Sequence, residues 1–123
     1  IDVAELAGES LIVQTPDNRS RALLDTVLGE RGIATRIIAS SELETIVQSL
    51  AAAGHGVGVL TERPNYRVHA VRLFDRGHPL EVVMRASWHA DHYAAVAIQR
   101  LATRFAQHME AATIRIAQSQ GWL

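Results

Sequence analysis

Two adjacent serines, Ser40 and Ser41, are the residues of this chain best suited to hold a small anion. They precede an apolar helical pattern that starts at Leu43, so the free N–H groups of its first turn lie next to two hydroxyls. These donors and the helix dipole favour a bound carboxylate or sulfate. Ordinary helix capping by one of the two serines is the structural alternative. We interpret the pair as a candidate anion-binding site.

A second polar group, Thr15-Pro16-Asp17-Asn18, follows a buried strand expected over residues 11–14. Open α/β sheets bind ligands at the carboxyl ends of their strands, where this segment would lie. The alternative is a turn that opens the next helix, because Pro, Asp and Asn are typical turn residues. Thr15 is therefore the second candidate for ligand contact.

The run Gly54-His55-Gly56-Val57-Gly58 has the glycine content of a nucleotide-binding loop. Such a loop stands between a strand and a following helix, whereas here a helix precedes the run and a strand follows it. We therefore do not assign nucleotide binding. His55 suits an exposed turn, and one His without partners does not make a catalytic site.

The pair His89 and His92 has a spacing found in metal sites, with Asp91 between them. Zinc sites need three or four ligands, and Asp91 more naturally caps the helix that follows. The chain shows no Ser-His-Asp set, no paired carboxylates and no G-x-S-x-G motif. We expect no catalytic residue, no metal and no cofactor, and therefore no enzyme.

Alternating strands and helices must position these residues. The apolar periodicity predicts a helical turn over residues 3–8, helices over residues 19–31 and 43–53, and a long final helix over residues 91–118. It predicts strands over residues 11–14, 35–39, 57–60, 68–74 and 80–86, with a turn at 75–79. Gly32 and Gly54 are expected to end the two internal helices. This order predicts an α/β fold with a mixed sheet.

The composition limits the possible classes of protein. With 123 residues, of which 48% are hydrophobic, the chain can form one domain with a substantial core. A net charge of −1 excludes a global basic field for nucleic acid. The absence of Cys excludes disulfides and fits a reducing compartment. No apolar run reaches about 18 residues and no signal peptide is visible, so we expect a cytoplasmic protein without a membrane span.

In order, the segments LAGESLIV, RALLDTVLGERGI, SSELETIVQSLAAAGHGVGVL, V-x-L-x-D and LEVVMRAS resemble the effector-binding domain of LysR-type transcriptional regulators. The resemblance implies one Rossmann-like lobe of a type 2 periplasmic-binding-protein-like fold. Residues 1–88 would form the second lobe, and residues 89–123 a helix that returns to a first lobe absent from this chain. Two positions depart from the family pattern. Thr61 stands where Pro commonly follows the buried strand, and His55 stands where an aliphatic residue is usual.

The resemblance implies an effector-sensing module that binds a small-molecule co-inducer in a cleft between two lobes. A small organic acid or anion is the expected ligand. Ser40 and Ser41 would supply the second lobe's main contribution to the cleft, and Thr15 and His55 complete the candidate effector contacts. DNA would be bound only through a helix-turn-helix domain absent from this chain. The alternative on the same fold is a solute-binding protein of a transport system.

The final helix leads us to expect a homodimer. Its apolar residues recur at spacings of three and four, so they form a stripe that needs a partner surface. The far end of the helix is also expected to pack against another surface, through Ile114, Ile116, Trp122 and Leu123.

Overall fold

The computed structural model of the chain describes residues 1–119 and residue 121. These residues form two compact units, Ile1–Val82 and Val83–Leu123. Among the described residues the first unit holds the strands, two α-helices and a short 3-10 helix, and the second holds one long α-helix.

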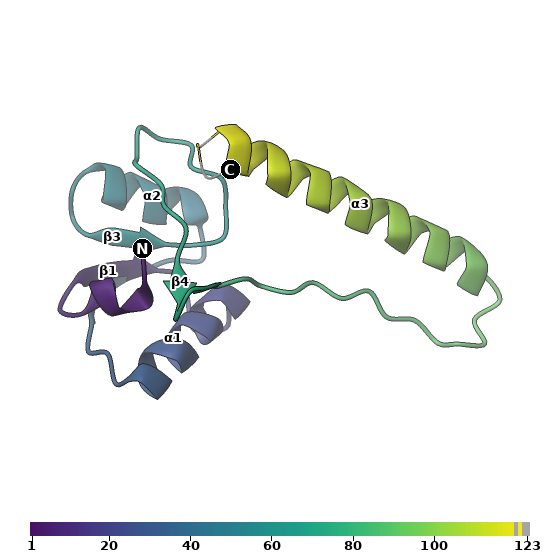
Figure 1. The fold of residues 1–123 in the computed structure, drawn as a ribbon, viewed down its shortest axis with the longest axis horizontal. Helices are drawn as coiled ribbons and strands as arrows, with labels where there is room; N and C mark the ends of the chain where they lie inside the picture. The colour runs from purple at the N-terminus through teal and green to yellow at the C-terminus, as the bar shows by residue number, and fades with distance from the viewer. Residues whose placement is uncertain (120, 122–123) are drawn as a thin grey trace. The chain divides into compact units, whose positions relative to one another are not determined.

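A three-stranded parallel sheet forms the centre of the first unit (Figure 1). Its order is β2-β1-β3, with β1 (Ser10–Val13) between β2 (Arg36–Ser40) and β3 (Val57–Val59). The three apolar residues of β1 are fully buried, as expected for a strand that is covered on both faces. The parallel sheet is therefore organised around the first strand of the chain.

The helices α1 (Arg19–Arg31) and α2 (Glu44–Ala52) cover opposite faces of this sheet (Figure 1). The cluster on the α1 face consists of buried aliphatic side chains, namely Leu6, Leu11, Val13, Leu24 and Leu28. On the other face Gly58 packs against α2. A Cβ at this position would lie 3.2 Å from the Ala51 Cβ and 3.4 Å from the Val47 Cγ1. The glycine therefore allows α2 to approach the sheet closely.

Local end signals set the predicted bounds of α1. The Asn18 Oδ1 accepts the Ser20 N–H at 2.8 Å, and Gly32 ends the helix in the left-handed conformation at φ 63°. Gly54 adopts the left-handed conformation at φ 79° two residues after α2 ends at Ala52, as expected for the residue that stops this helix. At the start of the chain η1 (Val3–Leu6) is a 3-10 turn capped by Asp2, within the helical turn predicted over residues 3–8.

Neither Ser40 nor Ser41 caps α2, so the capping role considered as the structural alternative for this pair is wrong. The residue in the capping position is Leu43, and its side chain makes no capping hydrogen bond. The reason is strand pairing, because Ser40 pairs with Val13 and the Ser41 N–H donates to the Val13 carbonyl oxygen at 3.1 Å. Both serines therefore stay in the extended segment before the helix. The Ser41 Oγ instead accepts the Leu43 N–H at 3.1 Å.

The strands predicted over residues 68–74 and 80–86 are mostly absent. A hairpin of β4 (Phe74–Asp75) and β5 (His78–Pro79) replaces them and occupies the segment predicted as a turn. The main chain at residues 72–74 pairs with the N-terminus. The Ile1 amino group donates to the Arg72 carbonyl oxygen, and the Phe74 N–H donates to the Ile1 carbonyl oxygen, each at 2.9 Å. The chain is α/β with parallel and antiparallel pairing, as predicted.

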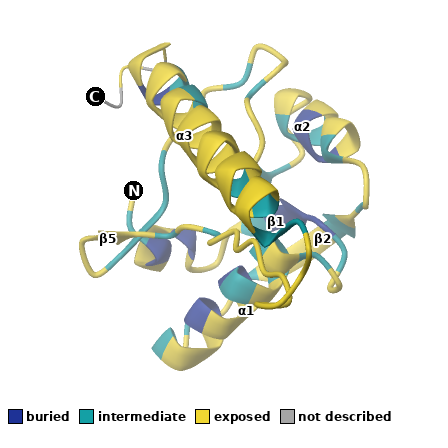
Figure 2. Cartoon of the chain, turned by 90° about the vertical axis from the view of Figure 1, so that its right-hand side faces the viewer, coloured by how far each residue is buried: buried dark blue, intermediate teal, exposed yellow. Residues whose placement is uncertain are grey.

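The second unit contains α3 (Ala95–Ser119), so the predicted long helix begins four residues later than expected. Asp91 precedes this start by four residues and does not cap it. Most of α3 is exposed (Figure 2). In the predicted stripe Leu101 is 69% exposed and Phe105 51%, while Trp122 and Leu123 lie outside the described residues. No helix in the described part of the chain is long and apolar enough to cross a membrane.

Candidate functional site

The carboxyl ends of β1 and β2 bring three of the four predicted contacts to one edge of the sheet. Val13 and Ser40 are the last paired residues of their strands, and Ser41 follows directly. Thr15 lies two residues after the end of β1. Because parallel strands end at the same edge, Thr15, Ser40 and Ser41 share the position at which open α/β sheets bind ligands.

His55 lies at the opposite edge of the sheet, because it precedes β3 while the other three residues follow strands. Gly56, the next residue, packs against the amino end of β1, where a Cβ would collide with the Ser10 carbonyl oxygen. His55 is exposed and lines a shallow hollow of about 230 Å³ beside Ile38 and Leu50. The structure therefore does not bring His55 to the other three residues, and its contact with an effector stays a prediction.

The two serine hydroxyls have different partners. The Ser40 Oγ donates to the Gln14 carbonyl oxygen at 3.3 Å, so its proton is already used. The Ser41 Oγ accepts the Leu43 N–H, and among the described residues its own proton has no acceptor. In the first turn of α2 the Ile46 N–H donates to the Leu43 carbonyl oxygen at 3.0 Å, while the N–H groups of Glu44 and Thr45 have no acceptor among the described residues. Ser41 is therefore the serine that is free to donate to an anion.

The Thr15 hydroxyl is engaged within its own turn. It donates to the carboxylate of Asp17, and this hydrogen bond lowers the pKa of Asp17. The Thr15 carbonyl oxygen accepts the Asn18 N–H at 3.0 Å. The turn therefore places the carboxylate of Asp17 at the edge of the sheet. Because the Thr15 hydroxyl proton is already donated, Thr15 is less suited than Ser41 to bind an anion.

Gln14 is a residue of this edge that the sequence analysis missed. Its side chain is only 2% exposed, and both ends of its amide are hydrogen-bonded. Nε2 donates to the Glu44 Oε1 at 2.8 Å, and Oε1 accepts the Ser20 Oγ at 2.5 Å. One side chain therefore joins the first turn of α1 to the first turn of α2. The available signal was an amide at the end of the apolar run Leu11–Val13, because a buried polar group needs partners.

The Gln14 main chain is also satisfied by side chains. Its carbonyl oxygen accepts the Arg21 Nη1 at 3.0 Å in addition to the Ser40 hydroxyl. The Arg21 Nε makes two 2.8 Å bonds to the carboxylate of Asp25. Because its guanidinium group binds Asp25 and the Gln14 carbonyl oxygen, Arg21 is not available to bind a ligand.

Glu44, the first residue of α2, has an unusual ionisation. Its burial and the neighbouring carboxyl of Glu62 raise the pKa of Glu44 from 4.5 to about 7, and the Gln14 hydrogen bond opposes the shift. The acid therefore changes its charge near neutral pH, three residues from Ser41.

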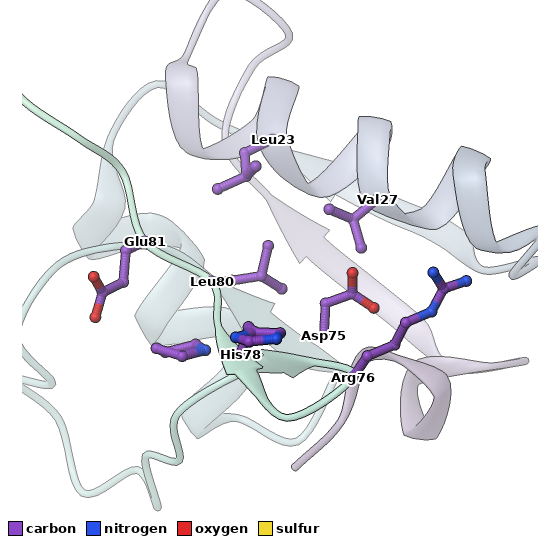
Figure 3. A pocket seen from close by; sticks show the side chains of 8 residues that line it. Leu23, Val27, Asp75, Arg76, His78, Leu80 and Glu81 are labelled. Carbon is purple, nitrogen blue, oxygen red and sulfur yellow. The ribbon is translucent and has the colours of Figure 1, made fainter.

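A larger hollow, of about 400 Å³, lies between α1 and the β4–β5 hairpin (Figure 3). Leu23, Val27 and Leu80 form its apolar lining. Its two acids are already paired within the chain, Asp75 with Arg31 and Glu81 with Arg72. None of the predicted contact residues lines it, so it does not belong to the carboxyl-edge site.

The two histidines with metal-like spacing use their Nδ1 atoms as acceptors within the chain. His89 accepts the Asp91 N–H at 3.3 Å, and His92 accepts the Ala94 N–H at 3.1 Å. The described residues contain no group of three His, Asp or Glu side chains that could hold a metal ion.

Comparison with known families matches residues 1–110 to a model described as the LysR substrate binding domain. The match includes the whole parallel sheet, α1, α2 and the first part of α3. Searches of curated proteins and of solved structures gave no significant match.

Proposed function

The chain belongs to the LysR substrate binding domain family, the effector-binding module of LysR-type regulators, and on this premise we propose that the carboxyl edge of β1 and β2 binds a small organic acid. The observation that carries the proposal is the free hydroxyl proton of Ser41 beside the start of α2. A carboxylate there would accept from this hydroxyl and from first-turn N–H groups. Ser40 and Thr15 border the same position.

The protonation state of Glu44 should control how well an acidic ligand binds. An anion held beside the start of α2 is repelled by an ionised Glu44 and tolerated by a protonated one. Because the pKa of Glu44 is about 7, we expect effector affinity to rise as the pH falls below neutrality. This expectation links the proposed ligand class to a measurable pH dependence.

The effector would act by favouring one arrangement of two lobes over another. A ligand shifts such an equilibrium only by its difference in affinity for the two states. In this proposal the chain supplies the second lobe, a homodimer transmits the change, and DNA is bound by a separate helix-turn-helix domain. The family match favours such a cytoplasmic, non-catalytic regulator over the solute-binding protein of a transport system.

Thermal shift on the full-length regulator tests the proposal. Small carboxylic acids should raise the Tm, while their uncharged amides should not. Ser41→Ala should weaken the response about tenfold, the effect of losing roughly 1.4 kcal/mol of binding energy. Ser49→Ala is the matched control, because Ser49 is exposed on α2 and, within the described part of the chain, its hydroxyl bonds only the Thr45 carbonyl oxygen. A flat response to a broad panel of acids, or equal responses of the two variants, would reject the site.

A further inference from the structure

The hollow between α1 and the β4–β5 hairpin has the size and lining of a small-molecule site. Its volume of about 400 Å³ lies within the range of ligand pockets. Leu23 and Val27 line it from α1, and Leu80 faces them from the end of the hairpin (Figure 3). The Leu80 N–H donates to the Leu73 carbonyl oxygen at 2.9 Å, and Leu73 packs against the buried core. The floor of the hollow is therefore a fixed aliphatic surface.

Arg76 stands at the tip of the hairpin in a conformation that arginine rarely adopts. It forms the two-residue turn together with Gly77, and the φ angles of the two residues are 49° and 82°. A turn with two positive φ angles favours Asn followed by Gly, because a longer L side chain costs conformational energy there. Among the described residues Arg76 is the only one other than glycine with a positive φ. Its N–H donates to the Asp2 Oδ2 at 3.0 Å and so helps to hold this conformation. The strain at Arg76 points to a use for its side chain.

The guanidinium of Arg76 is an unpaired charge at the rim of the hollow. In the part of the chain that the structure describes, this group makes no hydrogen bond or ion pair. The two acids of the rim, Asp75 and Glu81, are already paired with other arginines of the chain. The Arg76 side chain extends from the hairpin toward Val27, and the imidazole of His78 can offer a further N–H at the same rim (Figure 3). The hollow thus combines an aliphatic floor with a cation that is free to bind an anion.

We propose that this hollow binds a small aliphatic monocarboxylic acid, with the carboxylate on Arg76 and the alkyl chain over the aliphatic floor. Arginine suits a carboxylate because its planar fork can donate two hydrogen bonds at once. The floor suits an alkyl chain, since each buried CH₂ group is removed from water. A sugar or a dianion fits less well, because it would place unpaired polar groups on the floor. None of the residues of the carboxyl edge lines the hollow, so this second site does not depend on the proposed function.

An NMR titration of the 123-residue chain with hexanoate tests the site. The methyl signals of Leu23, Val27 and Leu80 should shift on a saturable curve. Hexanoate should bind about tenfold more tightly than butanoate, because two more CH₂ groups are buried. Hexanamide, which keeps the alkyl chain but has no charge, should bind about fivefold more weakly than hexanoate. Ser41→Ala should leave the titration unchanged, so failure of this site and failure of the carboxyl-edge site are distinguishable.

The variant Arg76→Asn separates the role of the guanidinium in binding from its role in the fold. Because Asn is favoured in this turn, the Tm of the ligand-free variant should be higher by about 2 °C or more, while its affinity for hexanoate should fall about fivefold. Arg67→Gln is the matched control. Arg67 is exposed and lies outside the lining of the hollow, so this change should affect neither quantity.

Three results would overturn the proposal. The first is equal affinity for hexanoate and hexanamide, because the guanidinium would then have no part in binding. The second is an Arg76→Asn chain that loses stability or keeps its full affinity for hexanoate. The third is a set of methyl shifts that follow the protein concentration and not hexanoate, because a second copy of the chain would then occupy the hollow.

Discussion

Gln14 and Glu44 are joined by a 2.8 Å hydrogen bond from Nε2 to Oε1, although they lie 30 positions apart in the sequence. The bond ties the end of the central strand to the start of the helix on one face of the sheet. On its other side the same amide accepts the hydroxyl of Ser20, near the start of the helix on the opposite face. The starts of both crossover helices therefore depend on one buried side chain.

Gln14→Leu should lower the free energy of unfolding by about 2 kcal/mol, because the partners on both helices lose a buried hydrogen bond. Urea denaturation followed by circular dichroism measures this change. The matched control is Gln107→Leu on the exposed surface of α3, which should stay within about 0.5 kcal/mol of the native chain. Equal stability of the two variants would contradict a linking role for Gln14.

Two glycine-to-alanine substitutions should change stability in opposite directions. At Gly56 a Cβ would collide with the Ser10 carbonyl oxygen, so Gly56→Ala should cost about 2 kcal/mol or more. At Gly29, inside α1, a Cβ meets nothing within 4 Å, and Gly29→Ala should stabilise the chain by about 0.5–1 kcal/mol. Thermal melts of the two variants decide the matter, and a stabilised Gly56→Ala would refute the close approach of β3 and β1.

Stability should fall as the pH rises from about 4.5 to about 7, in so far as it depends on Glu44. The pKa of Glu44 is higher in the folded chain than in the unfolded one, so the folded state binds more protons in this interval and loses stability as they leave. The free energy of unfolding should change by up to about 1 kcal/mol, because the exposure of Glu44 and Glu62 to solvent limits the effect. Urea midpoints across this range should flatten in Glu44→Gln, while Glu42→Gln should keep the native slope.

The exposed apolar residues of α3 should support self-association. Leu101 and Phe105 lie four residues apart on one face of the helix and are 69% and 51% exposed. Sedimentation equilibrium should show a dimer, and Leu101→Glu should weaken it by tenfold or more, about 1.4 kcal/mol. Gln107→Glu, on a different face, should leave the association unchanged. A chain that remains monomeric at high concentration would contradict the expected homodimer.

Where neighbouring residues decide an element, its position was predictable from the sequence. Both ends of α1 depend on Asn18 and Gly32, which act within a few residues of themselves. The start of α2 was not predictable in this way, because the pairing of Ser40 with Val13 keeps the chain extended there. The hairpin at Phe74 likewise depends on pairing with residues at the N-terminus, more than 70 positions away.

In the candidate site, too, some features could be predicted from the order of the elements and others depend on contacts in the folded chain. The order of strands and helices was enough to bring Thr15, Ser40 and Ser41 to one edge, because each follows a parallel strand. His55 was grouped with them although it precedes its strand. Gln14 was missed because its importance comes from Ser20 and Glu44, and the position of Glu44 beside it is a property of the folded sheet.

The central place of β1 determines the order in which this unit can assemble. Both of its neighbours are made later, and the second of them, β3, ends only at Val59. Until then Leu11, Ile12 and Val13 have at most one strand to pair with, although they become the most deeply buried strand of the sheet. During synthesis these three residues form an exposed apolar segment that is prone to aggregate. The segment is buried only after both helical crossovers have formed. Newly made chains should therefore be most prone to aggregate, and most dependent on chaperones, in the interval before β3 is added.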